Sequence, residues 1–123
     1  MQQVLAVAVG GALGCLCRYG ANVACVRWFE TPVFYSTLAV NVVGAFLVGL
    51  IAGLPFMQHP VLTAGAAVGF LGGLTTFSTF SAEVTELLAQ GQYGAGALLA
   101  ATHLAGSLLL TAAGFATFRA LAT

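Results

Sequence analysis

A run of glycine, hydroxyl and aromatic residues in the third quarter of the chain is the segment best suited to chemistry. From Gly69 it reads Gly-Phe-Leu-Gly-Gly-Leu-Thr-Thr-Phe-Ser-Thr-Phe-Ser-Ala-Glu, within otherwise apolar sequence. Gly72 and Gly73 lower helix propensity, and Ser and Thr hydroxyls can satisfy backbone groups freed at a break. Free carbonyls at such a break bind cations and free amides attract anions. The segment therefore predicts an ion site, with an unbroken helix that uses small and hydroxylated residues for packing as the alternative.

Phe77 and Phe80 are three residues apart, so they share a face of any helix that contains them. Ser78 and Ser81 flank them. An aromatic ring has a positive edge, which can partner a small dehydrated anion without trapping it. The same spacing is ordinary for phenylalanines that face lipid or a protein core, and that remains the alternative.

Single polar residues also occur inside the apolar stretches, where they are functional candidates by default. Asn41 lies in a run of Val and Ala and needs partners in protein or water. Arg18 either serves a polar path or extends its charge to the membrane surface. Glu83 either accepts hydrogen bonds along that path or lies near the interface with Glu86.

A polar stripe is predicted near the carboxyl end of the chain. His103, Ser107 and Thr111 recur every four residues and therefore line one helix face. Such a stripe suits the wall of a pore. Hydrogen bonds between helices explain it about as well.

The composition identifies the elements that must position these residues. Hydrophobic residues make up 60% of the 123 and charged residues only 5%, which leaves too little polar surface for a soluble domain. A membrane-spanning helix needs about 20 mainly apolar residues. We expect an all-α integral membrane protein, one domain over 1–123, with a first helix that is not a cleaved signal. Its four helices are predicted at about Gln3–Val26, Phe34–Leu54, Val61–Leu88 and Gly94–Leu121, the third broken near Gly72–Ser78.

Several classes of function fit poorly with this composition. The sequence has neither Lys nor Asp, and its formal net charge is zero, so a nucleic-acid footprint is not predicted. No His/Cys/Ser set suited to acid–base or nucleophilic work is apparent, and we expect neither an enzyme nor a nucleotide partner. The three cysteines all fall in the first predicted helix and are read as packing residues.

Charge at the loop ends does not favour either orientation in the membrane. Short loops make neighbouring helices antiparallel, so Arg27 and Arg119 fall on opposite sides. This tie predicts dual topology, with opposite copies paired as an antiparallel homodimer. Reporter fusions at the carboxyl terminus that show a single orientation would contradict it.

Three segments resemble the Fluc/CrcB family of fluoride channels, and the similarity runs along almost the whole chain. Composition and spacing predict only a membrane bundle with an ion site. The identification of the ion as fluoride comes from this resemblance. The matching segments are Gly10–Gly14 with Arg18 and Tyr19, then Thr37–Gly44, and above all Gly72–Ser81 with Glu83.

The resemblance implies passive export of fluoride across a bacterial inner membrane, which relieves fluoride toxicity. It implies an antiparallel dual-topology homodimer with two pores at the subunit interface. It also implies a structural sodium ion, held by the main-chain carbonyls of Gly72 and Thr75 from both subunits. Phe77 and Phe80 would turn their ring edges to fluoride.

Further residues take implied roles at matching positions. Asn41 would donate its amide to the path, and Arg18 would supply positive potential near the vestibule. The remaining polar lining or its support would be Thr37, Ser78, Ser81, Glu83, His103, Ser107 and Thr111.

A dual-topology, proton-coupled exporter of small molecules is the alternative function. That mechanism needs an embedded carboxylate in the substrate cavity. Neither of the first two predicted helices contains one, and Glu83 follows the channel-like segment. A purely structural membrane subunit would not need the Thr-Thr-Phe-Ser-Thr-Phe cluster.

Overall fold

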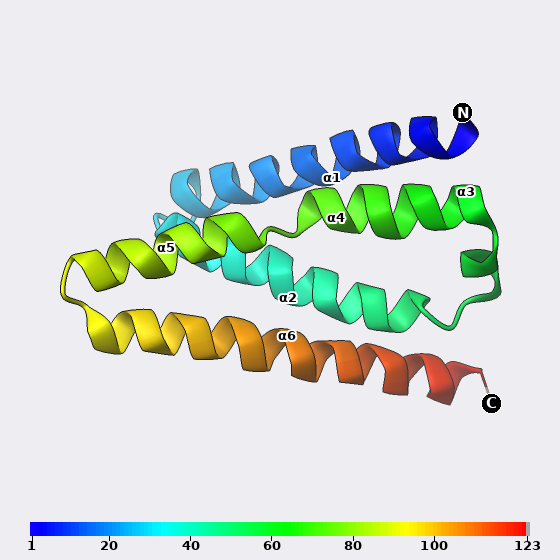
Figure 1. Cartoon of the computed structure of the whole chain (residues 1–123). Helices are drawn as coiled ribbons and strands as arrows, with labels where there is room; N and C mark the ends of the chain where they lie inside the picture. The colour runs from blue at the N-terminus through cyan, green and yellow to red at the C-terminus, as the bar shows by residue number, and fades with distance from the viewer. Residues whose placement is uncertain (123) are drawn as a thin grey trace.

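The computed structural model describes residues 1–122, without the side chain of Phe56, and its regular elements are all helices (Figure 1). Four helical segments are long and apolar enough to cross a membrane. They are α1 (Gln2–Arg27), α2 (Val33–Ile51), a composite third span over Pro60–Ala89, and α6 (Tyr93–Leu121). The chain is a multi-pass membrane protein. Both ends of the described chain lie at one end of the bundle (Figure 1).

The third span is built from four pieces and contains the predicted break. A 3₁₀ turn, η1 (Pro55–Gln58), leads into it. Its pieces are α3 (Pro60–Thr63), η2 (Ala64–Leu71), α4 (Gly72–Leu74) and α5 (Phe77–Ala89). The backbone is extended at Thr75 and Thr76, inside the predicted range and beginning two residues after the paired glycines.

The eight-residue π-helix η2 was not expected from the sequence. Its residues are mainly Gly and Ala, so no bulky side chain opposes the wider turn. π-Helical turns are rare and are frequent at functional sites. This one ends directly before the segment that carries the break.

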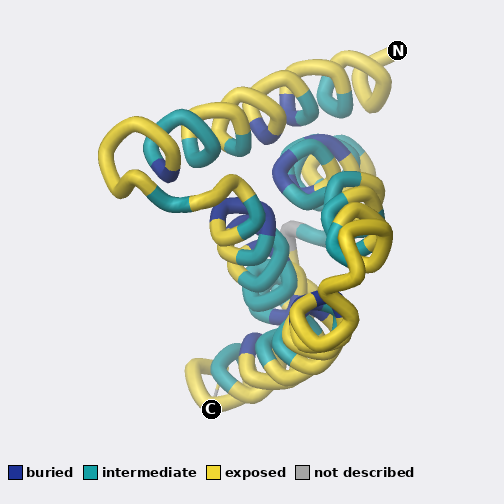
Figure 2. The backbone as a smooth tube through the Cα atoms, turned by 90° about the vertical axis from the view of Figure 1, so that its left-hand side faces the viewer, coloured by how far each residue is buried: buried dark blue, intermediate teal, exposed yellow. Residues whose placement is uncertain are grey.

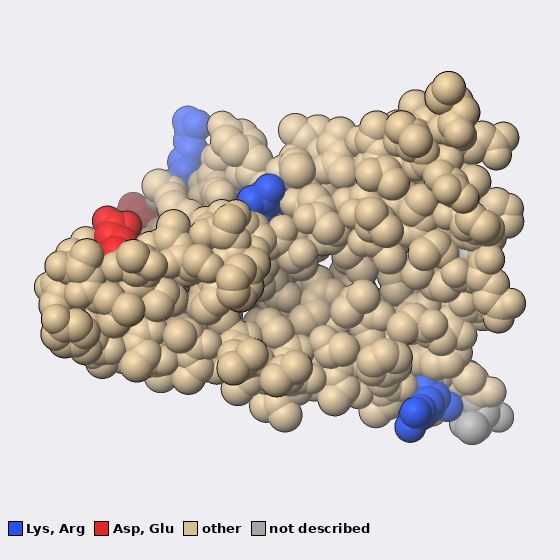
Figure 3. Space-filling model, viewed as in Figure 1, with Lys and Arg blue, Asp and Glu red and all other residues tan. Residues whose placement is uncertain are grey.

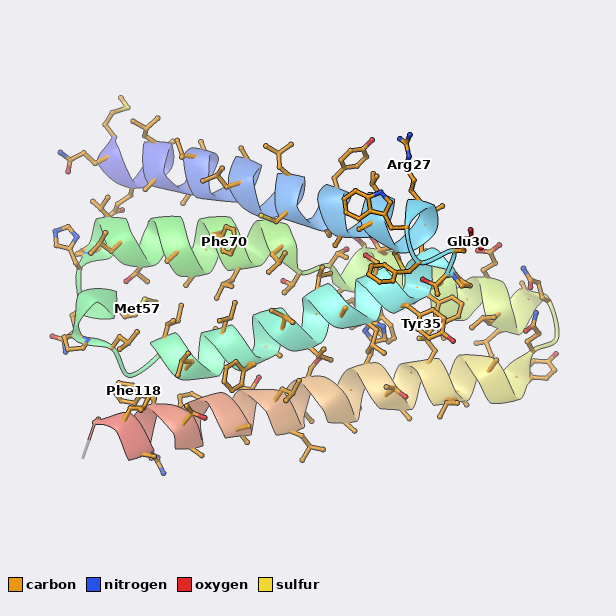
Figure 4. All side chains as sticks on the ribbon, turned by 180° about the vertical axis from the view of Figure 1, so that it is seen from behind. Arg27, Glu30, Tyr35, Met57, Phe70 and Phe118 are labelled. Atoms are coloured by element: carbon orange, nitrogen blue, oxygen red, sulfur yellow. The ribbon has the colours of Figure 1, made fainter. Side chains whose placement is uncertain are left out.

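The second helix ends at Ile51, three residues before the predicted end at Leu54. The apolar pattern continues through this region, so it gave no signal for the end. Leu54 instead donates its N–H to the carbonyl of Ile51 in a turn. At Gly53 a Cβ would collide with the ring of Phe118 on α6. Figure 4 shows Phe118 at the same end of the bundle as Met57.

α1 packs against the first half of the third span through backbone contacts. A Cβ at Gly10 would collide with the carbonyl oxygen of Gly65, and one at Gly14 with that of Phe70. Close approach of this kind is how helices associate where lipid provides no hydrophobic drive. We call this contact the glycine seam.

α2 packs on α6 by the same means. A Cβ at Gly49 would collide with the carbonyl oxygen of Thr111, and one at Gly114 with that of Phe46. The second half of the third span, α5, also lies against α6 (Figure 1). α2 and α6 are therefore held firmly on one side of the break, as α1 is on the other.

Few side chains are fully enclosed by the single chain. Val40, Leu71 and Leu74 form the buried apolar cluster. Most large apolar side chains are exposed. Exposed residues follow one another along the outer side of α1 (Figure 2). This surface suits lipid or a second protein chain.

Charged side chains are sparse on the surface (Figure 3). Arg27 and Glu30 lie together at the end of the bundle opposite the carboxyl terminus (Figure 4). Arg119 lies in the last turn of α6, near the carboxyl terminus. The fold therefore keeps one flanking arginine at each end.

Candidate ion site at the helix break

Thr76 starts the second half of the broken helix. Its Oγ1 accepts a hydrogen bond from the backbone N–H of Thr79 at 3.2 Å, which makes it the N-cap of α5. Thr75 closes the first half, because its Oγ1 donates to the carbonyl of Leu71 at 2.9 Å. Thr76 thus satisfies a free N–H at the start of α5, whereas the Thr75 hydroxyl adds a second hydrogen bond to the Leu71 carbonyl, which already receives the Thr75 N–H.

Asn41 of α2 pairs with the Thr76 peptide groups through both ends of its amide. Its Oδ1 accepts from the Thr76 N–H at 2.7 Å, and its Nδ2 donates to the Thr76 carbonyl at 3.0 Å. The polarity of the backbone fixes which end of the amide is oxygen, an assignment that usually has to be inferred. Asn41 therefore holds the break to α2.

Arg18 reaches the break from the opposite side. Its Nε donates to the carbonyl of Gly73 at 3.1 Å, across a separation of 55 residues. In a continuous helix this carbonyl would receive the N–H of Phe77. The arginine replaces that lost partner.

The carbonyls of Gly72, Leu74 and Thr75 at the break keep no hydrogen-bond partner among the residues that the structure describes. In a continuous helix, the Gly72 carbonyl would accept the N–H of Thr76, but that N–H donates to Asn41. The Thr75 carbonyl would accept the N–H of Thr79, but that N–H donates to the Thr76 hydroxyl. Uncharged main-chain oxygens suit a hard cation. The carbonyls of Gly72 and Thr75 therefore fit the sodium site that the family resemblance implies.

A cavity of about 480 Å³ opens beside the break. Its walls come from α2, η2, α4, the start of α5, and α6. The hollow in the middle of the face in Figure 3 lies over these elements. Eight of the predicted site residues line it: Asn41, Gly72, Thr75, Phe77, Phe80, His103, Ser107 and Thr111.

Three rings stack at the wall of this cavity. Phe77 and Phe80 meet edge to face, with ring centroids 5.3 Å apart and planes at 65°. Phe80 then stacks on the imidazole of His103 at 4.3 Å. Phe77 is 79% exposed on the single chain, whereas His103 is only 4% exposed. The row of rings therefore runs from the open surface into the protein.

The polar stripe of α6 faces the cavity as its spacing predicts. Thr111 donates its hydroxyl to the carbonyl of Ala45 on α2 at 3.0 Å. Ser107 makes no hydrogen bond with the described residues. One member of the stripe thus joins helices, and another offers a hydroxyl to the cavity.

Glu83 and Thr37 lie away from this cavity. Thr37 donates its hydroxyl to Oε1 of Glu83 at 2.6 Å and is almost fully buried. The second oxygen of Glu83, Oε2, is buried with no partner among the described residues. Glu83 and Glu86 share a separate pocket of about 270 Å³. The carboxylate is anchored to α2 through Thr37.

Ser78 and Ser81 also fall outside the lining of the main cavity. Ser81 donates to the carbonyl of Phe77, one turn back in its own helix, at 2.9 Å. Ser78 lies 3.3 Å from the Thr76 hydroxyl. In the single chain these hydroxyls are used for local bonds.

Known proteins are similar to this chain over nearly its whole length. A family model described as "CrcB-like protein, Camphor Resistance (CrcB)" matches residues 5–115. The chain is 47% identical over 124 residues to a protein of Cupriavidus taiwanensis named "Fluoride-specific ion channel FluC", with 96% of this chain and 95% of that protein covered. Proteins of the same name from Variovorax paradoxus and Rhodospirillum centenum are 44% and 43% identical, over 97% and 93% of this chain and 96% and 90% of theirs. The chain belongs to the CrcB family.

For this CrcB-family chain, sequence reasoning missed one central residue. Thr76 was read only as part of the hydroxyl cluster, yet it caps α5 and receives Asn41. A threonine at the start of a helical segment is a standard N-cap signal, so the cap could have been found. The pairing with Asn41, 35 residues away, has no signal in a single sequence.

Proposed function

We propose that this chain forms a passive, fluoride-selective channel that lets fluoride leave the cell down its gradient. The observation that carries the proposal is the similarity, over more than nine tenths of the chain, to proteins named fluoride-specific ion channels. A channel of this kind performs no catalysis and needs no nucleotide. Its place is the plasma membrane, which in a Gram-negative bacterium is the inner membrane.

The cavity supports this proposal chemically. Fluoride is small and strongly hydrated, so a selective path must replace its water with hydrogen-bond donors and positive ring edges. Phe77 and Phe80 present such edges, and the Ser107 hydroxyl is open to the same space. Among the described residues, none that lines the cavity is a Lys or Arg, whose fixed charge would hold the anion too long. Arg18 lies behind the break and acts on the path through its field.

A sodium ion at the break belongs to the same proposal. The carbonyls of Gly72 and Thr75 are among the carbonyls of the break that have no hydrogen-bond partner in the described residues, whereas Arg18 and Asn41 occupy those of Gly73 and Thr76. A cation there would satisfy them and raise the local potential for an anion. Sodium would thus serve structure and electrostatics together.

An antiparallel homodimer completes the proposed channel. Irregular backbone survives at membrane depth only where protein covers it or water reaches it. Gly72 and Ser78 are exposed on the single chain at the break. A second copy would cover this face and supply a second set of carbonyls to sodium. One arginine near each end of the bundle permits opposite orientations, since neither side then carries an excess.

The test is ion efflux from liposomes that hold the purified protein, read with fluoride- and chloride-selective electrodes. A potassium ionophore sets the voltage and allows charge to balance. We expect rapid release of fluoride with chloride retained. Release of neither ion, from protein shown to be folded and inserted, would refute the channel and favour the proton-coupled exporter.

A further inference from the structure

The turn between α1 and α2 carries two opposite charges that do not pair with each other. Arg27 is the last residue of α1 and Glu30 follows three residues later, and both side chains are exposed. Neither side chain has a hydrogen bond or an ion pair with the residues that the structure describes. The helix has ended before Glu30, so the carboxylate has left the register in which residues three apart face each other.

Buried contacts hold this turn in its shape. Glu30 has a φ of 51°, a left-handed conformation that is costly for a residue other than glycine. Thr31 donates its N–H and its hydroxyl to the carbonyl of Cys25, at 3.1 and 3.2 Å, and Cys25 is buried. Such a conformation persists only where its surroundings fix it, and it is frequent at ligand-binding sites. The backbone that carries the two charges is therefore held in place.

Aromatic residues typical of the lipid headgroup region gather at this end of the bundle. Trp28 is 75% exposed and Phe29 is 71% exposed, and both stand between the two charges in the sequence. Tyr35, in the first turn of α2, and Tyr93, the first residue of α6, lie at the same end (Figure 1). Trp and Tyr are enriched where a membrane meets water. The turn therefore lies at headgroup level.

We propose that this turn binds the headgroup of phosphatidylethanolamine, with the lipid phosphate on Arg27 and the lipid ammonium group on Glu30. Figure 4 shows Arg27 nearer the middle of the bundle and Glu30 nearer its end. The phosphate of this lipid likewise lies deeper in a bilayer than its ammonium group. Trp28 and Phe29 lie against the upper part of the acyl chains. The proposal goes beyond the channel function, because it concerns the outer surface of the protein.

The chemistry of the two charges selects one class of lipid. A guanidinium binds phosphate oxygens through paired N–H donors, which any phospholipid accepts. A primary ammonium group can donate hydrogen bonds to the Glu30 carboxylate, whereas the trimethylated group of phosphatidylcholine has no N–H to give. Phosphatidylglycerol has no cation for Glu30 and adds a net negative charge beside it. Phosphatidylethanolamine alone among these three satisfies both side chains.

The single tryptophan of the chain makes this site measurable, because its fluorescence reports the turn alone. The full-length protein is placed in phosphatidylcholine vesicles that contain a small, equal fraction of brominated phosphatidylethanolamine, phosphatidylcholine or phosphatidylglycerol. Bromine on the acyl chains quenches tryptophan at short range. We expect quenching by the brominated phosphatidylethanolamine about two- to fivefold above that by the phosphatidylcholine, as one exposed ion pair separates them. Equal quenching by the three lipids, or strongest quenching by phosphatidylglycerol, would overturn the proposal.

Charge variants at the turn test the two contacts separately. Glu30→Gln should bring quenching by phosphatidylethanolamine down to the phosphatidylcholine level, and Glu30→Asp, which keeps a carboxylate, should retain part of the difference. Arg27→Gln should also lower the ratio toward one, because the phosphate loses its partner. A preference for phosphatidylethanolamine that survives Glu30→Gln, or that Glu30→Asp loses completely, would overturn the role of the carboxylate.

The matched control is Arg119→Gln, since Arg119 also stands in the last turn of a helix but has no acidic residue or tryptophan beside it in the sequence. It should leave the quenching ratio at the wild-type value, and a lost preference in this variant would overturn the assignment to the turn. Size-exclusion profiles in detergent check that all variants fold alike. None of these measurements uses ion transport, so their outcome is separate from that of the channel proposal.

Discussion

The two sides of the broken helix differ in what touches it. On the α1 side, the glycine seam brings backbone against backbone at Gly10 and Gly14, and one arginine reaches the break. On the side of α2 and α6, polar side chains and rings surround a cavity of about 480 Å³. The tight side can hold the break in place while the open side leaves room for an ion. Rigidity and access are thus assigned to opposite faces of one helix.

The largest expected effect comes from filling the glycine seam. In Gly14→Val the new Cβ meets the carbonyl oxygen of Phe70 and the N–H of Leu74, and backbone cannot move aside as a flexible side chain can. We expect destabilisation of about 3 kcal/mol, seen as aggregation in size-exclusion chromatography and a lower melting temperature. Gly20→Val on the same helix is the control, since a Cβ there meets nothing within 4 Å. A stable Gly14→Val protein would mean that the seam is looser than described.

Loss of the clamp on Thr76 should have the next largest effect. In Asn41→Asp the carboxylate can still accept from the Thr76 N–H, but it faces the Thr76 carbonyl with an oxygen and adds negative charge to the cavity. We expect fluoride efflux to fall about 10- to 100-fold in folded protein. Asn22→Asp is the matched control, because Asn22 only accepts a hydrogen bond, from Ser36 at 2.6 Å. Unchanged efflux in Asn41→Asp would remove Asn41 from the mechanism.

Phe77 and Phe80 line the open side of the break. Phe77→Ile and Phe80→Met remove the positive edges but leave apolar volume, so assembly should persist. We expect each to slow fluoride efflux about tenfold, the upper end of what one aromatic edge contributes. The measurement is liposome efflux at equal protein content. Wild-type rates in both variants would show that the rings only pack.

The smallest effect is expected at Ser81, whose hydroxyl is already bonded to its own helix. Ser81→Ala should change fluoride efflux by less than about twofold, since only a local bond is lost. Ser107→Ala provides the contrast, because that hydroxyl is open to the cavity. The Ser107 variant should be the slower of the two in the same assay. The reverse order would place Ser81 in the path and Ser107 outside it.

Much of the fold follows from local composition. Apolar length predicts four long helices in the positions where the structure has them, and the helix break falls inside the predicted range. The predicted end of α2 was wrong, because the apolar pattern of the sequence continues past Ile51. In the structure, Gly53 packs against a ring from α6 just after the helix ends. The π-helical turns of η2 have no comparable signal, because Gly and Ala residues suit an α-helix in a bundle equally well.

The predicted site residues fall into two groups: those placed by the repeat of one helix and those placed by contacts between helices or subunits. His103, Ser107 and Thr111 face one cavity because a helical repeat alone puts them on one side of α6. Thr37, Ser78, Ser81 and Glu83 lie outside that cavity in the single chain, where their spacing along the sequence gives no information on what they meet. Their place in a pore depends on the second copy and stays a prediction.

The amino-acid sequence by itself determined that this chain is a membrane protein, how many long apolar helical spans it has, and where one of them breaks. Those features depend on the composition of continuous segments, which a single sequence displays. Only the tertiary structure decided which carbonyls at the break stay free. This depends on hydrogen bonds between residues 35 and 55 positions apart, and such pairs are set by how the helices pack.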